Sequence, residues 1–229
     1  MGMEVFHPTG EVRSVGKVGT VNEKAGTPAA PRCDWSCVAA RISEDRRALL
    51  RIVVERALEL GDFTLSSGRV SDYYIDGKQV TLSPDGALLF ARIILEALRG
   101  QPVDVVGGLS IGADPIVGSV ALLSELEARP LRGFIVRQER KSHGKMLDIE
   151  GPLKRDDRAV IVDDVITTGA SILKTIGEVE RHGAKVVGVL ALVDREEGRK
   201  TVLQEYPTFA IFTTAELKEA RRCREPSAT

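Results

Sequence analysis

From residue 43 onward, two kinds of segment alternate along the chain. Segments of the first kind are short and almost continuously apolar, as buried strands are; they span residues 103–108, 132–137, 159–164 and 185–194. In the second kind, apolar residues recur every three or four positions, as on one face of a helix; these segments span residues 83–100, 115–128 and 171–183. The alternation predicts an α/β fold, in which helices cover both faces of a mostly parallel central sheet.

One more helix and one extended segment are expected ahead of this alternation. Ser43 suits a helix start, because acidic residues follow it closely. Residues 73–80 look extended. The apolar face of the helix would carry five residues before Gly61 ends it, namely Leu49, Leu50, Val53, Ala57 and Leu60.

Residues 1–42 have a different character. Gly, Pro, Thr and Ser punctuate them, and neither a helical nor a strand period persists. Such a segment buries too little apolar surface to offset the entropy lost on ordering. We therefore predict a poorly ordered extension over residues 1–42, in which Trp35 is suited to dock on the body, and a single domain over residues 43–229.

Composition and charge exclude several classes of protein. The 229 residues are 43% hydrophobic and 28% charged, as in ordinary globular domains. A net charge of −1 gives no basic field for nucleic acid, and no apolar run approaches the ~20 residues of a membrane span. Cys33, Cys37 and Cys223 are an odd number, which argues against a disulfide framework. A zinc pair at Cys33 and Cys37 would need two more ligands, so reduced thiols in a cytoplasmic protein are the preferred interpretation.

The segment 159–171 combines two opposite kinds of chemistry. Its apolar strand runs into Asp163 and Asp164, and a loop rich in hydroxyl groups leads to the next helix. Amides at a helix N-terminus favour a phosphate, whereas ionised carboxylates accept hydrogen bonds from hydroxyl groups. A ribose 5-phosphate meets both demands, with its phosphate on the loop and its 2′ and 3′ hydroxyls on the carboxylates. The alternatives are a divalent cation, or carboxylates that only cap the following turn.

The loop after residue 136 is also unusual. Residues 137–158 exceed the ~2–6 residues common in compact α/β units, and the first part of the loop is basic. A mobile lid of this kind suits a substrate that ends in pyrophosphate. The alternative is a solvated basic surface loop. Arg195 follows the strand at 185–194, where a guanidinium suits bidentate recognition of a carboxylate; its alternative is a surface pair with Glu196 or Glu197.

The sequence VIVDDVITTGAS, at residues 160–171, closely resembles the phosphoribosyl-pyrophosphate motif of type I phosphoribosyltransferases. Further segments resemble the orotate phosphoribosyltransferases within that family. They are FTLSSGRVSDYYID at 63–76, VGGLSIGADPI at 106–116, FIVRQERKSHG at 134–144 and LVDREEG at 192–198. The similarity runs from about Arg46 to Phe212 and leaves out the extension.

The resemblance implies a fold with a small N-terminal hood, and the transfer of a phosphoribosyl group from phosphoribosyl pyrophosphate to orotate. It also implies Mg²⁺ held mainly through the substrate, with no direct protein ligands, and a homodimer whose lid is shared between subunits. Lys141, Asp163 and Asp164 would be catalytic, with Lys141 stabilising the transition state. The implied contacts to phosphoribosyl pyrophosphate are Arg137, Gln138, Lys141, His143, Asp163, Asp164, Val165, Ile166, Thr167, Thr168, Gly169, Ala170 and Ser171. The implied contacts to orotate are Thr167, Arg195, Tyr73 and Tyr74. Gln138 departs from the Lys that the family commonly has there.

Three other functions remain as alternatives. Residues 108–112 match G-x-S-x-G, the turn that carries the nucleophile of serine hydrolases. His182 is the candidate base, but it would lie at the opposite edge of the sheet from Ser110. The other two alternatives are a transferase for another base and a regulatory protein that senses phosphoribosyl pyrophosphate; the near-neutral charge disfavours a regulator that binds nucleic acid.

Overall fold

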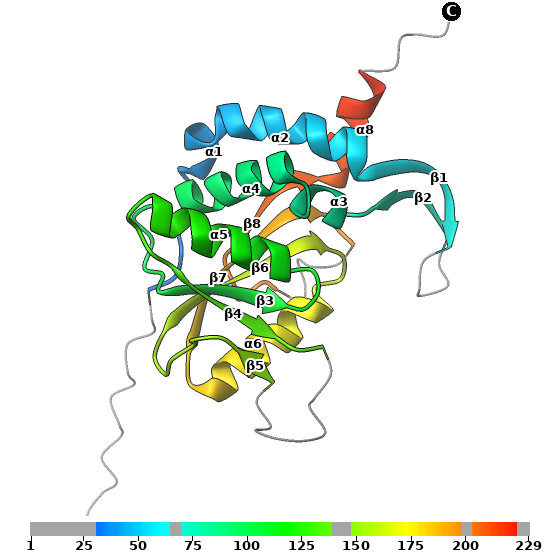
Figure 1. Ribbon diagram of the computed structural model, residues 1–229. Helices are drawn as coiled ribbons and strands as arrows, with labels where there is room; N and C mark the ends of the chain where they lie inside the picture. The colour runs from blue at the N-terminus through cyan, green and yellow to red at the C-terminus, as the bar shows by residue number, and fades with distance from the viewer. Residues whose placement is uncertain (1–30, 65–69, 139–147, 198–202, 224–229) are drawn as a thin grey trace, which may run out of the picture.

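The computed structural model describes residues 31–64, 70–138, 148–197 and 203–223. Its main sheet has six strands in the order β5-β4-β3-β6-β7-β8, all parallel except β5 (Figure 1). The four predicted strands are confirmed as β3, β4, β6 and β7. The strands are β3 Val105–Leu109, β4 Arg132–Val136, β5 Ile149–Glu150, β6 Arg158–Ile166, β7 Lys185–Asp194 and β8 Thr208–Thr213.

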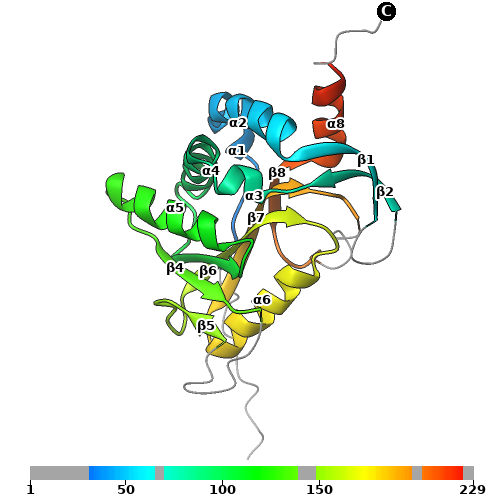
Figure 2. The same ribbon diagram turned by 45° about the vertical axis from the view of Figure 1, so that its right-hand side comes forward.

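Helices cover both faces of this sheet, which confirms the predicted fold class. α2, α4 and α5 lie on one face and α6 lies on the other (Figures 1 and 2). α8 packs against α2 at the C-terminal end of the described chain. The helices are α1 Val38–Arg41, α2 Ser43–Arg56, α3 Lys78–Thr81, α4 Pro84–Ala97, α5 Asp114–Leu126, α6 Ala170–His182 and α8 Thr214–Arg222. None of the helices in the described ranges is long and apolar enough to cross a membrane.

A two-stranded hairpin stands apart from the main sheet. β1 Leu58–Thr64 pairs antiparallel with β2 Val70–Ile75, and it projects from the body in Figure 2. The prediction that the first helix continues to Gly61 was wrong, because Leu58 already pairs with Ile75. Leu60 lies on β1, where it is 49% exposed, and not on the apolar face of a helix. The helical period of the last two predicted positions, Ala57 and Leu60, is weak evidence for a helix, and the backbone pairing of β1 with β2 decides the structure there.

The predicted boundary at residue 43 needs correction for residues 31–42. The Cys33 N–H donates a hydrogen bond to the Val187 carbonyl (2.9 Å), and Cys33, Val38 and Ile42 are buried in the main core. Trp35 packs so closely that a Cβ on Gly188 would lie 2.7 Å from its ring. The segment is therefore part of the packed body, because a few apolar groups fix it despite the polar residues around them. Residues 1–30 lie outside the described residues.

The predicted lid was also too long. Residues 139–147 lie outside the described residues, but the chain after them is packed. β5 pairs with β4, and Ile149 and Leu153 are buried in the core cluster beside α6. Asp157 is buried and forms a bidentate ion pair with Arg132 (2.7 Å for each N–O distance). Residues 148–158 therefore belong to the body rather than to a lid.

Strand β6 shows how the two core layers position the carboxylates. Val160 and Val162 belong to the core cluster that includes residues of α2, α4 and α5, whereas Ala159 and Ile161 belong to the cluster that includes residues of α6. Successive side chains of a strand point to opposite faces. The alternation buries both faces of β6 and carries the strand through the core to the two aspartates that follow.

Candidate active site

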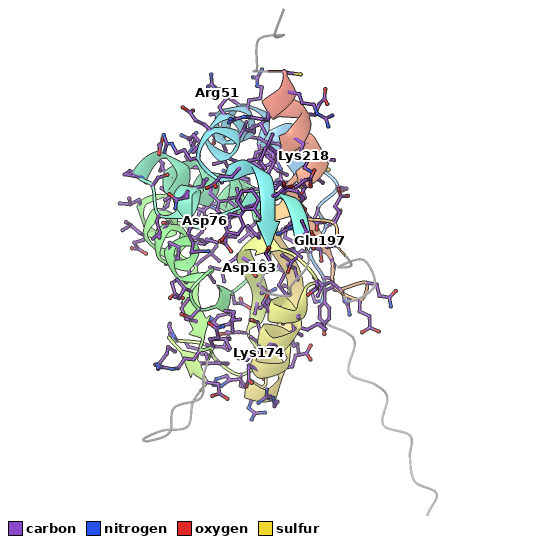
Figure 3. All side chains as sticks on the ribbon, turned by 90° about the vertical axis from the view of Figure 1, so that its right-hand side faces the viewer. Arg51, Asp76, Asp163, Lys174, Glu197 and Lys218 are labelled. Carbon is purple, nitrogen blue, oxygen red and sulfur yellow. The ribbon has the colours of Figure 1, made fainter. Side chains whose placement is uncertain are left out.

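Loops from several elements converge at the carboxyl edge of the sheet. Residues 110–113 link β3 to α5, residues 167–169 link β6 to α6, and residues 195–197 follow β7. The connection from β2 to α3 reaches the same region. Figure 3 shows Asp163 near the middle of this edge, with Asp76 and Glu197 on either side of it in that view. This convergence at the ends of parallel strands is the arrangement expected for a ligand site.

Asp163 and Asp164 are both buried, at 8% and 7% exposure. The Asp163 carboxylate accepts hydrogen bonds from the Asp164 N–H (3.0 Å) and the Ser171 hydroxyl (3.2 Å). The Asp164 carboxylate accepts one from the Val165 N–H (2.9 Å), and Lys78 Nζ lies 3.5 Å from its Oδ2. Such hydrogen bonds from nearby residues are those expected if the carboxylates cap the following turn. An ionised carboxylate has about four acceptor sites, so both groups keep capacity for a ligand.

The electrostatics of the pair are unfavourable in the free protein. Burial raises the pKa of the Asp163 carboxyl, and the neighbouring charge of Asp164 raises it further. The hydrogen bonds from Asp164 and Ser171 oppose this rise only in part. A buried like-charged pair is costly, and a strongly perturbed carboxyl in a cleft is a common sign of a functional site.

Two glycines allow the backbone to approach these carboxylates closely. A Cβ on Gly77 would lie 2.8 Å from Asp164 Cβ and 2.9 Å from its Oδ2. A Cβ on Gly112 would lie 2.7 Å from Asp163 Oδ1 and 2.9 Å from Asp164 Oδ1. Larger residues at either position would clash with the carboxylates. The two chain segments therefore form close walls around the carboxylate pair.

The loop before α6 has features that suit an anion. Gly169 precedes the helix in the left-handed conformation, with φ of 85°. Thr167, Thr168 and Ala170 are exposed, so their polar groups are open to a ligand. Ile166 is buried in the core and its carbonyl accepts a bond from the Arg195 N–H. Of the predicted phosphate contacts in residues 165–171, Ile166 is buried in the core and Val165 packs partly buried against it, so their side chains are committed to packing.

Arg195 is buried and paired, not a surface residue. Its Nη2 lies 2.8 Å from Glu197 Oε1, and its Nε donates a hydrogen bond to the Tyr73 hydroxyl (3.2 Å). The guanidinium also lies over the Tyr73 ring, 4.6 Å from the centroid. Tyr74 is on the other face of β2, 40% exposed and 5.7 Å from the Phe63 ring. The structure brings Tyr73 but not Tyr74 to Arg195.

Arg137 and Gln138, at the start of the predicted lid, border a cavity beside the β3 loop. The cavity has a volume of about 360 Å³ and is lined by Ser110, Ile111, Ile135, Arg137, Gln138 and Glu150. Arg137 pairs with Glu150 at 3.1 Å, and the Gln138 carbonyl accepts a hydrogen bond from Lys174. The predicted residues Lys141 and His143 lie outside the described residues.

Among the described residues, the serine-hydrolase alternative lacks its base. Ser110 donates a hydrogen bond to Asp114 Oδ2 (2.9 Å). His182 ends α6, where its Nε2 lies 3.2 Å from the Leu153 carbonyl. Since α6 begins at the carboxyl edge, its last residue lies at the opposite edge of the sheet. Nothing in these contacts activates Ser110.

Sequence reasoning missed two side chains that shape the site, Lys78 and Asp76, which flank Gly77 next to Asp164. The sequence signal for these two was the D-G-K run at the end of an extended segment. Glu197 was named as an alternative partner of Arg195, and the two do pair, but Arg195 is buried rather than at the surface. Within the described ranges, no group of three or more His, Cys, Asp or Glu side chains is arranged to hold a metal ion.

Comparisons with known proteins agree with this geometry. A family model for the phosphoribosyl transferase domain matches residues 76–213. The orotate phosphoribosyltransferase of Aquifex aeolicus is 40% identical over 178 residues, which cover 76% of this chain and 97% of that protein. The structure of Mycobacterium tuberculosis orotate phosphoribosyltransferase in complex with Fe(III) dicitrate matches with a TM-score of 0.66 and 34% identity, over 76% of this chain and 98% of the other. The structure of that enzyme in complex with 5-phospho-α-D-ribosyl 1-diphosphate matches with a TM-score of 0.64 and 31% identity, over 76% and 99%.

Proposed function

This chain belongs to the orotate phosphoribosyltransferases of the phosphoribosyltransferase family, and on that premise we propose that it transfers a phosphoribosyl group to orotate. The bond from C1′ to the pyrophosphate oxygen breaks, a bond from C1′ to a ring nitrogen of orotate forms as that nitrogen loses its proton, and pyrophosphate leaves while the proton passes to it or to solvent. The observation that carries the proposal is the buried pair Asp163 and Asp164, walled by Gly77 and Gly112 beside an anion loop.

Asp163 and Asp164 would hold the ribose. Their remaining acceptor sites suit the 2′ and 3′ hydroxyls, and the loop from Thr167 to Ser171 suits the 5′-phosphate at the N-terminus of α6. Positive charge that develops at C1′ would be stabilised by the carboxylates. Ligand hydroxyls would also relieve the mutual repulsion of the pair, since they replace lost water with fixed donors.

Orotate would lie at the other end of the ribose, near Arg195. A guanidinium that is already fixed by Glu197 and stacked on Tyr73 loses little freedom when it binds a carboxylate. The orotate carboxylate would compete with Glu197 for the Nη2 donor. Contacts from Thr167 and Tyr74 stay predictions.

The pyrophosphate end would face the β3 loop and the lid. Arg137 and Gln138 line the cavity there, and Lys141 and His143 are predicted to close over it. Mg²⁺ held mainly through the pyrophosphate would supply charge neutralisation there. The cytoplasmic location stays a prediction from the sequence.

We also propose a homodimer. Leu88 on α4 and Leu122 and Leu126 on α5 are 50%, 66% and 74% exposed on two helices that pack together. A group of large exposed apolar side chains is typical of an interface. Sedimentation of the wild type and of Leu122→Glu tests this; a dimer that becomes a monomer in the variant is expected, and a wild-type monomer would exclude it.

A spectrophotometric assay of orotate consumption tests the activity. With phosphoribosyl pyrophosphate and Mg²⁺, the protein should consume orotate and release pyrophosphate in equal amounts. Adenine, hypoxanthine and uracil in the same assay test the other bases. Preference for an uncharged base would assign the chain to another specificity, and binding of phosphoribosyl pyrophosphate without turnover of any base would favour the sensor.

A further inference from the structure

Lys78 is a cation that the resemblance did not bring into the site. It opens the short helix α3 directly after the hairpin, and its Nζ lies 3.5 Å from Asp164 Oδ2 and 3.2 Å from Asp76 Oδ1. The side chain is 44% exposed, so it borders both the buried carboxylate and the solvent-filled side of the site. It therefore has room for another anionic partner.

Asp76 holds this lysine from two directions. One oxygen of Asp76 accepts a hydrogen bond from the Lys78 N–H (3.1 Å) and pairs with Nζ, while the other accepts one from Gln79 Nε2 (3.1 Å). Gly77, between the two residues, lies against Asp164. The D-G-K run thus fixes the backbone next to the catalytic carboxylate and directs the ammonium group along it. A pre-positioned cation costs less entropy when it binds a ligand than a free lysine does.

The position of Lys78 assigns it to one end of the substrate. Ser171 and the anion loop lie on the Asp163 side of the carboxylate pair, whereas Lys78 lies on the Asp164 side. Arg195 lies with Glu197, and in Figure 3 Glu197 and Asp76 are on opposite sides of Asp163. Asp164 Oδ1 lies against Gly112 of the β3 loop, so Lys78, Asp164 and this loop are close together. With the 5′-phosphate at the anion loop and orotate at Arg195, Lys78 lies nearest to the pyrophosphate end of the substrate.

The β3 loop itself supplies no cation there. Residues 109–114 read LSIGAD, which contains Asp114 but neither Lys nor Arg. Asp76, Asp114, Asp163 and Asp164 together place several carboxylates at a site whose proposed ligand is a diphosphate. These carboxylates repel the negative charge of a diphosphate and disfavour its binding unless a cation lies between them.

We infer that Lys78 binds the pyrophosphate group of the substrate and neutralises it as it leaves. The inference rests on the proposed function for the identity of the substrate. In the free protein the ammonium group pairs with Asp164 and Asp76; in the complex it bridges Asp164 and a pyrophosphate oxygen. Lys78 is then a catalytic residue, because it touches the group whose negative charge grows as the C1′–O bond breaks.

The alternative is that Lys78 only neutralises Asp164. The two halves of the substrate separate these roles. A lysine that binds the leaving group affects magnesium pyrophosphate, whereas one that acts through Asp164 affects the ribose. Calorimetric titration with magnesium pyrophosphate and, separately, with ribose 5-phosphate measures each effect on the full-length protein.

The variants are Lys78→Met, which keeps the stem, and Lys78→Arg, which keeps the charge. Lys185→Met is the matched control, because Lys185 is 46% exposed and pairs with Asp156 at 3.6 Å, at the opposite edge of the sheet. Lys78→Met should weaken magnesium pyrophosphate by about tenfold, as expected for one charge-assisted contact at a half-exposed site. Its affinity for ribose 5-phosphate should stay within about twofold. Lys78→Arg should recover most of the loss, and Lys185→Met should behave as the wild type.

Thermal melting shows whether each variant is folded, and Lys78→Gln replaces Lys78→Met if that variant does not fold. Equal affinity of Lys78→Met and Lys185→Met for magnesium pyrophosphate would overturn the inference. Equal losses for both ligands would also overturn it, in favour of action through Asp164. Wild-type protein that binds pyrophosphate but consumes no orotate would overturn the proposed function and with it the catalytic role of Lys78, while a loss of pyrophosphate affinity in Lys78→Met would still assign the binding contact.

Discussion

The two edges of the central sheet use aspartate in opposite ways. At the amino edge, Asp104 and Arg158 form a bidentate ion pair at 2.8 Å, and the guanidinium of Arg158 lowers the pKa of Asp104 to about 2. Arg132 likewise lowers the pKa of Asp157, with N–O distances of 2.7 Å. At the carboxyl edge, Asp163 and Asp164 are buried beside each other, and the pKa of Asp163 is raised.

This difference separates stability from function. A bidentate pair with satisfied hydrogen bonds stabilises the ends of the strands that it joins. A buried pair of like charges costs stability and persists where a ligand or a reaction needs it. The amino edge therefore holds the strand starts together, while the carboxyl edge keeps acceptors available for a ligand.

Asp164→Asn should break the function of the carboxyl edge with the largest effect. The amide has lost the charge and half of the acceptor capacity that the ribose hydroxyls require, so turnover should fall by roughly 10²–10³. The free energy of unfolding should change little or rise. Steady-state kinetics with a parallel thermal melt measure both. Near-normal turnover would return the aspartate pair to a capping role.

Asp163→Asn should stabilise the fold at neutral pH. The pKa of Asp163 is raised from 3.8 to about 7, so the penalty of its charge is absent below pH ~4, grows as the pH rises, and levels off above ~7. The variant should gain on the order of 2–4 kcal/mol of unfolding free energy over the wild type at pH 8 and almost nothing at pH 4. Urea unfolding at several pH values measures the difference. A gain that does not depend on pH would show that Asp163 is not the titrating group.

Asp157→Asn, at the amino edge, should destabilise the fold, in contrast to Asp163→Asn. It breaks a largely buried pair with Arg132, so the free energy of unfolding should fall by about 1–3 kcal/mol at pH 7, while turnover of the folded enzyme stays unchanged. The lowered pKa of Asp157 means that this stabilisation is present above pH ~4 and is lost as the pH falls below it. Reduced turnover in protein that is still folded would contradict the separation of the two edges.

Arg195→Ala sharpens the comparison, because Arg195 forms an ion pair at the carboxyl edge. If this pair serves a ligand, the KM for orotate should rise by about tenfold, as for the loss of one charge-assisted contact. The KM for phosphoribosyl pyrophosphate should stay within about twofold. Steady-state kinetics with each substrate varied in turn measure this split. A loss of stability with unchanged orotate kinetics would place Arg195 with the structural pairs of the amino edge.

Much of this fold was predictable from local pattern. The strands β3, β4, β6 and β7 are runs of apolar residues that only a doubly covered sheet buries, and α4 and α6 show helical periods with clear starts and stops. The strand β5 was missed because its two residues are too few to show a period, and β8 was missed although four of its six residues are apolar. The docking of Trp35 on the body was expected from its size and is confirmed, but its contact with Gly188 is long-range and has no local signal.

The site was predictable where one motif carries it. The segment from Asp163 to Ser171 contains both the carboxylate pair and the loop predicted to bind an anion, within nine consecutive residues. The approach of Lys78 to Asp164 depends on how the hairpin is placed over the sheet edge. That contact is set by tertiary packing, so spacing in the sequence does not reveal it.

Calorimetric titration of phosphoribosyl pyrophosphate with Mg²⁺ into three proteins tests the central claim most directly. The three proteins are the wild type, Asp157→Asn and Asp164→Asn. The two variants carry the same substitution at opposite edges of one sheet. Asp157→Asn should bind within about twofold of the wild type at a temperature where it is folded, whereas Asp164→Asn should bind at least about tenfold more weakly. Wild-type affinity in Asp164→Asn, or an equal loss in both variants, would contradict the assignment of ligand binding to the carboxyl edge.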